Sequence, residues 1–557
     1  MEGASLKREI AMNGDQTIAK ILKKEGVEWI GAFPHQPLID AAAIEGIRPI
    51  LSRTERAGVN MADGFSRVSN GKKIGVFTMQ TGPGAENAYA GVAQAFADSI
   101  PILLLPGGQS RDRTQVHPNF ESVENYRGVT KWAAEINLVS RVPELMRRAY
   151  SQLKHGKPGP VLLEIPSDVG PEEFPSETID YRPGRPYKSG ADPSDVRELV
   201  SKLLKASCPI AYVGQGVLWA EASEELLELA ELIHIPVMTT LAGKSAFPEN
   251  HRMALGTGGH TGTLMVDHFI KKTDFVLGIG SSFSITTFNA PLPNNVPLAQ
   301  ITDCSEDVNK AYPIDYGAIG DARIVIRQVI DEVKRQLGTQ GREDVLGMAD
   351  EIGKVKAVFM QEWSPRLNSD EVPISPYRVF SELAKTIDVA NTIITHDSGY
   401  PRDQLVPFWQ TVTPRGYLGW GKSTQLGYGL GLAMGAKLAA PEKHVVNVMG
   451  DAAFGMAGMD VETAVRSEIP ILTIVLNNGV MTHYDHHMSF ASKHWGSNKL
   501  GGNYTKVAEG LGAYAERVAT PDQIGKAIRR AIAANQEGRP ALLEMMTKVE
   551  EEVPKFW

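Results

Sequence analysis

The sequence predicts an α/β protein built from three doubly wound, parallel-sheet domains. Short apolar runs rich in Val, Ile and Leu alternate with helix-length segments along most of the chain, as in βαβ units. A chain of 557 residues exceeds what one hydrophobic core accommodates, so roughly three to four domains are expected. A stretch rich in Pro, Gly and charge at 181–195 and a charged, partly helical stretch at 341–369 separate three blocks. These blocks are 1–180, 196–340 and 370–557.

The first block carries the clearest alternation. An amphipathic helix, GDQTIAKILKKEG, opens it and is closed by Gly26. Its predicted strands are VEWIGAF, RPILSRTE (ending at Glu55), KKIGVFTM, IPILLLPGG and GPVLLEIPSDVG.

The second block has a weaker binding signal. Its predicted strands include PIAYVGQG, IPVMTT, DFVLGIGSSF and PLAQITDCSE. Gly-Gln-Gly after the first of these fits part of a nucleotide-binding turn but lacks the full glycine fingerprint. Asp303 ends the last strand, where an acid commonly bonds ribose hydroxyls or instead caps the next helix.

Composition narrows the class of protein. With 42% hydrophobic and 22% charged residues and a net charge of −8, we expect neither nucleic acid nor an acidic membrane as partner. Cys208 and Cys304 form no disulfide framework, which favours a reducing compartment. The stretch MEGASLKREIAMNGDQ contains no apolar h-region, so we expect no secretory signal, and no apolar stretch approaches the ~20 residues of a membrane span. We therefore expect a cytoplasmic protein acting on a small molecule.

The third block holds the most informative stretch, 443–481. Apolar, β-branched runs end at Gly450-Asp451 and at Asn477-Asn478, with a helical segment at 459–467 between them. Parallel strands bring Asp451 and Asn478 to the same sheet edge, where open α/β sheets bind ligands. A carboxylate and a carboxamide suit Mg²⁺ carrying a diphosphate. The alternative is a capping Asp and an Asn-Asn-Gly turn.

This stretch resembles the thiamine diphosphate (ThDP) fingerprint of the acetolactate synthase and pyruvate decarboxylase superfamily. Its filling, AFGMAGMDVET followed by Arg466 and Pro470, is more narrowly similar to oxalyl-CoA decarboxylases and 2-hydroxyacyl-CoA lyases. The resemblance implies Mg²⁺ at Asp451, Asn478 and Val480. The cofactor contacts that it implies in this stretch are Gly450, Asp451, Ala452, Ala453, Asn478, Val480 and Met481.

Glu55 supplies the other half of the resemblance. It stands in RTERAGVNMADGFSRVS, followed by TGPGAENA, and alone it reads as a solvated or helix-capping carboxylate. In the superfamily a Glu in this context hydrogen-bonds N1′ of the ThDP pyrimidine. The 4′-amino group then becomes an imine that removes the C2 proton, giving the nucleophilic ylide.

Further cofactor contacts follow from the same resemblance. Leu426, in QLGYGLGLAMGA, corresponds to the bulky residue that wedges ThDP into its bent shape, although this segment also reads as a closely packed glycine-rich helix. HDSGYPRDQ resembles the loop that receives the diphosphate. The residues expected at the pyrimidine are Thr81, Gly82, Pro83, Gly84 and Asn87, and those at the diphosphate are Ser398, Gly399 and Tyr400.

Three segments are candidates to face the substrate. His35 and Gln36 lie where the superfamily places a loop over the thiazolium. There we expect a donor to a carbonyl oxygen or, since His titrates near neutrality, a proton shuttle; the alternative for His35 is a loop-capping role. Phe120-Glu121 resembles the aromatic-Glu pair of oxalyl-CoA decarboxylases, which makes Glu121 a candidate acid or base. Thr482 and Tyr484 stand near the position of that group's tyrosine. The neighbouring His483, His486 and His487 fit no common zinc spacing and favour a solvated lid.

The leading expectation for function is a ThDP- and Mg²⁺-dependent carbon–carbon lyase. It would cleave, or reversibly form, a 2-hydroxyacyl-CoA to give formyl-CoA and an aldehyde or ketone. One alternative is an acetolactate synthase-like carboligase or decarboxylase of free 2-oxo acids, favoured by Gly-Asp-Ala at 450–452 and GTGGHTGT at 256–263. Another is an oxalyl-CoA decarboxylase. A regulatory subunit is disfavoured by the joint presence of Glu55, Asp451 and Asn478.

The resemblance also bears on the central block and on assembly. CoA-using members bind ADP there and acetolactate synthases bind FAD, so Asp303 does not separate the two classes. Family members place ThDP between domains of two subunits, which implies a homodimer or homotetramer.

Overall fold

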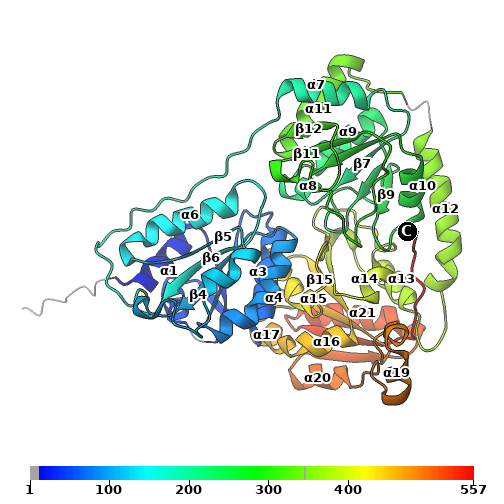
Figure 1. Ribbon diagram of the computed structural model, residues 1–557. Helices are drawn as coiled ribbons and strands as arrows, with labels where there is room; N and C mark the ends of the chain where they lie inside the picture. Colours follow the sequence, from blue (N-terminus) through cyan, green and yellow to red (C-terminus); the bar gives the residue numbers. More distant parts are fainter. Residues whose placement is uncertain (1–11, 35, 344–346, 557) are drawn as a thin grey trace, which may run out of the picture. The chain divides into compact units, whose positions relative to one another are not determined.

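The computed structural model describes residues 12–34, 36–343 and 347–556. Within these residues, three parallel sheets of six strands each carry helices on their faces (Figure 1). This confirms the predicted three-domain, doubly wound α/β fold. The chain forms two compact units, one ending at Pro186 and the other spanning 187–557 together with 67–72. No helix in the described ranges has the length and apolarity needed to cross a membrane.

The first unit is built on a sheet of order β2-β1-β3-β4-β6-β5. Its core strands form because apolar runs such as Ile102–Gly108 are buried along their whole length. The strands are β1 Trp29–Phe33, β2 Arg48–Leu51, β3 Gly75–Met79, β4 Ile102–Gly108, β5 Trp132–Glu135 and β6 Val161–Pro166. The helices are α1 Gly14–Lys24, α2 Leu38–Ile44, α3 Glu55–Val68, α4 Pro83–Ala97, α5 Ser122–Tyr126 and α6 Val142–Lys154.

One strand boundary differs from the prediction in a way that concerns the site. The expected strand ending at Glu55 stops at Leu51, and Glu55 is instead the first residue of α3. The intervening residues 52–54 turn the chain, and a carboxylate in the first helical turn is favourable because the helix dipole is positive there.

The central sheet has the order β9-β8-β7-β10-β11-β12. Its strands are β7 Pro209–Val213, β8 Val237–Thr239, β9 Ala254–Thr257, β10 Phe275–Ile279, β11 Leu298–Thr302 and β12 Tyr316–Ile319. Its helices are α7 Pro193–Leu203, α8 Gly216–Trp219, α9 Ser223–Ile233, α10 Leu264–Lys272 and α11 Ala322–Leu337. In chain order this is the 3-2-1-4-5-6 arrangement of dinucleotide-binding folds, whose direction reverses between β7 and β10. The helix α12 (Met348–Leu367) leads on to the last domain.

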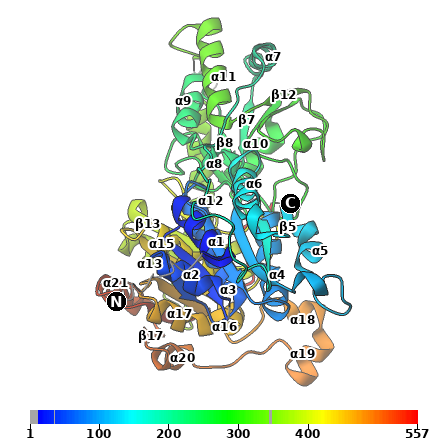
Figure 2. The same cartoon turned by 90° about the vertical axis from the view of Figure 1, so that its left-hand side faces the viewer.

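The last sheet has the order β14-β13-β15-β16-β18-β17. Its strands are β13 Thr392–His396, β14 Tyr417–Leu418, β15 His444–Gly450, β16 Leu472–Asn477, β17 Tyr514–Val518 and β18 Ala541–Met546. Its helices are α13 Pro376–Thr386, α14 Tyr400–Leu405, α15 Tyr428–Ala439, α16 Asp451–Ala457, α17 Val461–Arg466, α18 Tyr484–His487, α19 Ser489–Trp495, α20 Tyr504–Gly510 and α21 Pro521–Gln536. The short helices α18 and α19 lie together at one end of this domain, away from α20 and β17 (Figures 1 and 2).

The first and last sheets therefore share one topology. Numbered within its own domain, each has the order 2-1-3-4-6-5, and all pairings are parallel. Connections diverge between the first and third strands of such a sheet, which opens a crevice at their carboxyl ends. The residues that follow β1, β3, β13 and β15 are thus in position to bind ligands.

Candidate active site

Asp451 stands at the crevice of the last sheet, directly after β15. Its side chain is buried, and both carboxylate oxygens accept backbone hydrogen bonds: Oδ1 from Ala452 N at 2.8 Å and Oδ2 from Gly479 N at 2.9 Å. Burial raises the pKa of Asp451, and these N–H groups offset part of that rise. No basic side chain is among the causes of the shift, so the buried negative charge suits a cation.

Asn478 reaches the same place from the next strand. The strands β15 and β16 are parallel neighbours, with Gly450 opposite Leu476. Asn478 Oδ1 accepts a hydrogen bond from Val480 N at 3.1 Å, and its Nδ2 donates to Thr482 Oγ1 at 2.9 Å. Since Gly479 N bonds Asp451, the segments that carry the expected carboxylate and carboxamide are joined.

Asp397 organises the neighbouring loop, and the sequence analysis missed it. It follows β13 and is buried; Oδ1 accepts from Ser398 N at 2.7 Å and from Gly427 N at 2.9 Å. Oδ2 accepts from Gly429 N at 2.8 Å. These bonds fix the start of α15 beside the partly exposed Leu426. An acid directly after an apolar strand was the available signal.

Glu55 is the corresponding acid in the first unit. Its side chain is 4% exposed, and it forms a hydrogen bond with Asn87. Burial raises the pKa of Glu55, and the Asn87 bond offsets part of the rise. A Cβ atom at Gly84 would lie 3.5 Å from Glu55 Oε1, which places the first turn of α4 beside the carboxyl. A buried carboxyl with a raised pKa is suited to sharing a proton with a ring nitrogen.

Gln36 and Thr81 form a second polar group in this unit. Gln36 is 8% exposed, and its Nε2 has no hydrogen-bond partner among the described residues. A Cβ atom at Gly107 would lie 3.0 Å from this nitrogen and 2.8 Å from Thr81 Oγ1, so both side chains face Gly107. An unpartnered buried amide donor fits a polar ligand atom. His35, its expected companion, lies outside the described residues.

Glu121 lies near two further acids. It precedes α5, and its Oε1 accepts a hydrogen bond from Gln115 N at 2.9 Å. Glu164, on β6, is buried; burial, with smaller contributions from Glu135 and Glu121, raises its pKa to about 7. A carboxyl that titrates near neutrality is a candidate proton carrier. The sequence analysis missed Glu164 because it lies inside an apolar strand.

The segment after Asn478 contains an unexpected cluster. His483 Nδ1 and His486 Nε2 lie 3.6 and 3.5 Å from Glu551 Oε2. The ligand atoms of these three side chains lie within 4.8 Å of one another. Tyr484, expected near the position of the decarboxylase tyrosine, is exposed. Glu551, distant in sequence, was not foreseen.

The structure also places the remaining expected residues. Gly82, with φ of 69°, and Pro83 begin α4; Ser398 and Gly399, with φ of 89°, lead into α14 at Tyr400. Ala452 and Ala453 are in the first turn of α16. Val480 pairs with Lys499, and Met481 N donates to Asn498 O at 2.7 Å. Phe120 precedes α5 and is half-buried. Asp303 is exposed after β11, one strand away from the central crevice.

Comparison with known sequences identifies the family. Residues 12–130 match the N-terminal TPP binding domain of thiamine pyrophosphate enzymes, 196–329 their central domain, and 397–545 their C-terminal TPP binding domain. The chain belongs to the thiamine pyrophosphate enzymes. This confirms the superfamily inferred from Glu55, Asp451 and Asn478, and with it a ThDP-dependent enzyme.

The relatives of this enzyme correct the expected branch. A probable acetolactate synthase large subunit of Methanococcus aeolicus is 31% identical over 96% of this chain and 92% of its own length. One from Methanocaldococcus jannaschii is 30% identical over 98% and 93%. The acetolactate synthase large subunit of Haemophilus influenzae is 29% identical over 94% and 92%. The residues between Asp451 and Asn478 suggested an acyl-CoA lyase, whereas these relatives support the carboligase alternative.

The residues present fit the cofactor. Asp451 and Asn478 offer the hard oxygen ligands that Mg²⁺ prefers beside a diphosphate. Glu55 offers a buried carboxyl, and Gln36 an unpartnered donor. Gly399, at the start of α14, has open space around its Cα, which admits a close ligand.

Proposed function

We propose that this protein is an acetolactate synthase-type carboligase, which decarboxylates one free 2-oxo acid and joins the remaining fragment to a second. The observation that carries the proposal is the near full-length similarity to acetolactate synthase large subunits. This similarity, together with the carboxyl and carboxamide groups at the strand ends, favours ThDP chemistry on free acids over ThDP chemistry on CoA thioesters.

ThDP, when bound, supplies the carbanion chemistry of the reaction. Glu55 would share a proton with the pyrimidine nitrogen, which the raised pKa of its carboxyl favours. Asp451 and Asn478 would hold Mg²⁺ at the diphosphate, and Asp397 fixes the neighbouring loop. Gln36 donates to a substrate oxygen, and Glu121 with Glu164 moves a proton.

The central domain is proposed to bind a nucleotide cofactor. We expect it to prefer FAD to ADP, in keeping with the carboligase branch. Its strand order places the crevice between β7 and β10, where Gly214 and Gly280 approach closely. A Cβ at Gly214 would lie 2.3 Å from Gly280 O, so only glycine fits there. Completion of the site by a second copy of the chain, in a dimer or tetramer, belongs to the same proposal.

Product analysis separates the enzyme classes. Purified protein with ThDP and Mg²⁺ is given pyruvate in one reaction and a 2-hydroxyacyl-CoA in another. We expect CO₂ and a carboligated hydroxy-oxo acid from pyruvate, and no formyl-CoA from the thioester. Formyl-CoA as the main product would overturn the carboligase proposal, and retention of ADP in place of FAD would point the same way.

A further inference from the structure

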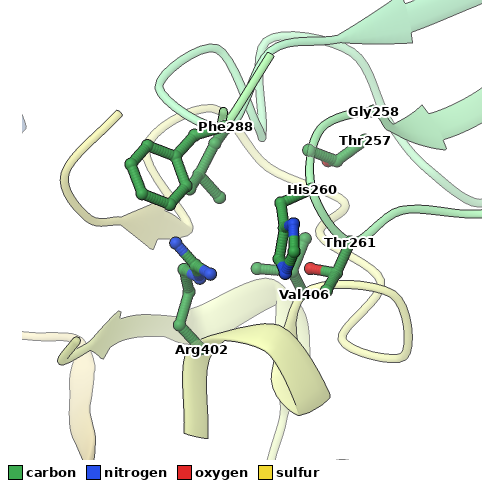
Figure 3. Close-up of a pocket in the computed structure, with 8 residues that line it drawn as sticks. Thr257, Gly258, His260, Thr261, Phe288, Arg402 and Val406 are labelled. Carbon is green, nitrogen blue, oxygen red and sulfur yellow. The ribbon is translucent and has the colours of Figure 1, made fainter. Parts of the chain in front are cut away.

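A pocket in the second unit lies between the central and last domains. One wall is the loop that follows β9, and the other is α14 of the last domain (Figure 3). Arg402 rises from α14 and His260 comes from the loop, and both side chains point into the same hollow (Figure 3). The residues that line it are Leu241, Thr257, Gly258, His260, Thr261, Phe288, Arg402 and Val406.

Arg402 is buried with most of its donors unused. Its side chain is 6% exposed, and Nε and Nη1 have no hydrogen-bond partner among the described residues. Within the described part of the chain, its Nη2 alone is engaged, in an ion pair with Asp403. A guanidinium carries five N–H donors, and a buried donor without a hydrogen-bond acceptor costs free energy. Nε and Nη1 are therefore left for a partner other than the described protein groups.

The surroundings hold the guanidinium in place without satisfying it. Its Cζ lies 4.8 Å from the ring centroid of Phe288 and 4.6 Å from that of Trp420. Aromatic faces stabilise the cation but offer no hydrogen-bond acceptor comparable to an oxygen. Burial lowers the pKa of Arg402 to about 9, which leaves it charged at neutral pH.

The balance of charge around the pocket is positive. Lys555, on the C-terminal segment, and Arg402 both act to lower the pKa of His260, although burial is the larger cause. Pro554 O accepts a hydrogen bond from Gly262 N at 3.3 Å, which holds this segment on the loop. The opposing charge is Asp403, whose Oδ1 bonds Arg402 and also accepts from Thr261 Oγ1 at 3.4 Å. Glu249, which accepts from the lining Thr257 Oγ1 at 3.5 Å, is paired with Lys244, so the remaining charge around the pocket is positive.

We propose that this pocket binds an oxyanion, a carboxylate or a phosphate group, between Arg402 and His260. Nε and Nη1 of Arg402 donate to its oxygens in the bidentate manner typical of guanidinium, and the Thr261 hydroxyl and His260 imidazole complete the set. Because the loop and α14 belong to different domains, the bound anion bridges them. The proposal does not depend on the carboligase function, since it concerns binding alone.

Calorimetric titration of the full-length, ThDP-loaded protein tests this site. Oxamate serves as the carboxylate probe and inorganic phosphate as the phosphate probe. We expect saturable binding of at least one probe. Tighter binding of oxamate would assign the site to a 2-oxo acid, and tighter binding of phosphate would assign it to a phosphorylated ligand. Arg402→Gln should weaken the favoured probe by about 10- to 100-fold, the effect of losing bonds from a charged donor.

Matched variants separate binding from folding. Arg335→Gln makes the same chemical change at an exposed side chain of α11 and should leave the affinity for the probe unchanged. His260→Gln leaves the Phe288 and Trp420 rings beside Arg402 unchanged and should weaken binding by about 2- to 10-fold. It replaces Arg402→Gln as the test variant if that protein does not fold. Absence of saturable binding of both probes, or equal affinity in the wild type and in folded pocket variants, would overturn the proposal. Product analysis, by contrast, reports on the carboligase function independently.

Discussion

The first and last domains share one strand order but carry opposite chemistry at their crevices. After β13 and β15 stand two buried carboxylates, Asp397 and Asp451, each held by backbone N–H groups. At the equivalent strand ends of the first domain, after β1 and β3, stand the neutral Gln36 and Thr81. Its acid, Glu55, is placed instead at the start of α3.

This difference teaches that topology sets where a ligand binds, while strand-end residues set which part of it binds. Acids held by backbone donors suit a cation with a diphosphate, whereas an amide, a hydroxyl and one protonatable carboxyl suit a ring with nitrogen atoms. The two domains are thus proposed to receive the two ends of one cofactor. The predictions at Glu55, Asp451 and His396 each disturb one side of this comparison, and the one at Lys244 tests the contact that the last domain makes with the central domain.

The largest effect is expected at Glu55. Glu55→Gln keeps a hydrogen bond but removes the acid, so kcat for pyruvate should fall by about 10²- to 10⁴-fold, the usual contribution of a positioned acid or base. Steady-state assay with saturating ThDP and Mg²⁺ measures it.

The control for this change is Glu124→Gln, at a side chain that is 70% exposed, which should retain the wild-type rate. Undiminished turnover in Glu55→Gln would remove the first domain from the proposed chemistry.

The second effect concerns the join between the central and last domains. Lys244 Nζ lies 2.5 and 2.7 Å from the two oxygens of Glu249, and both side chains are buried. Glu249 Oε2 also accepts from Thr411 N, in the last domain, at 2.8 Å. Lys244→Met leaves this carboxylate uncompensated and should lower the free energy of unfolding by about 3–5 kcal/mol.

Urea unfolding followed by tryptophan fluorescence measures this loss. Lys526→Met, at a pair whose side chains are 61% and 71% exposed, should change the midpoint little, because exposed pairs contribute about 0–1 kcal/mol. Equal midpoints for the two variants would contradict the importance of the buried pair.

The third effect is on metal and cofactor retention. Asp451→Asn removes the charge and replaces one of the two accepting oxygens with an NH₂ group, so Mg²⁺ should support ThDP binding only at concentrations about 10- to 100-fold higher. Titration of Mg²⁺ at fixed ThDP, read by calorimetry, gives the shift. Asp522→Asn, at a side chain that is 71% exposed, is the control and should titrate as wild type.

The sequence predicted the strands that carry the site because they are buried and apolar. The runs that became β1, β3, β4, β15 and β16 are continuous, and a polar residue marks where most of them end. Several edge strands were missed, although the edge strand β2 was predicted: β5 is half-buried along its length, and β9 and β12 span four residues each. The order of strands, and hence the shared topology, depends on long-range packing that periodicity does not encode.

The site residues also divide into those that the sequence predicted and those that it did not. Asp451 and Asn478 were found because strand-end position and residue type sufficed. Asp397 and Arg402 were passed over inside one polar segment, since their burial is set by contacts with distant parts of the chain. The branch that the residues between Asp451 and Asn478 suggested differs from that of the relatives, whose similarity extends over most of the chain.

The smallest effect tests a buried residue that distinguishes the two sheets. β13 ends at His396 where β1 ends at Phe33, and burial lowers the pKa of His396 to about 3. The unfolded chain takes up a proton below about pH 6.5 that the folded protein refuses, so stability falls as the pH drops below that value. The slope approaches about 1.4 kcal/mol per pH unit. In His396→Asn this contribution should vanish, so urea midpoints between pH 7 and pH 5 should decline less than in the wild type. A matching decline in both proteins would mean that His396 gains its proton in the folded state.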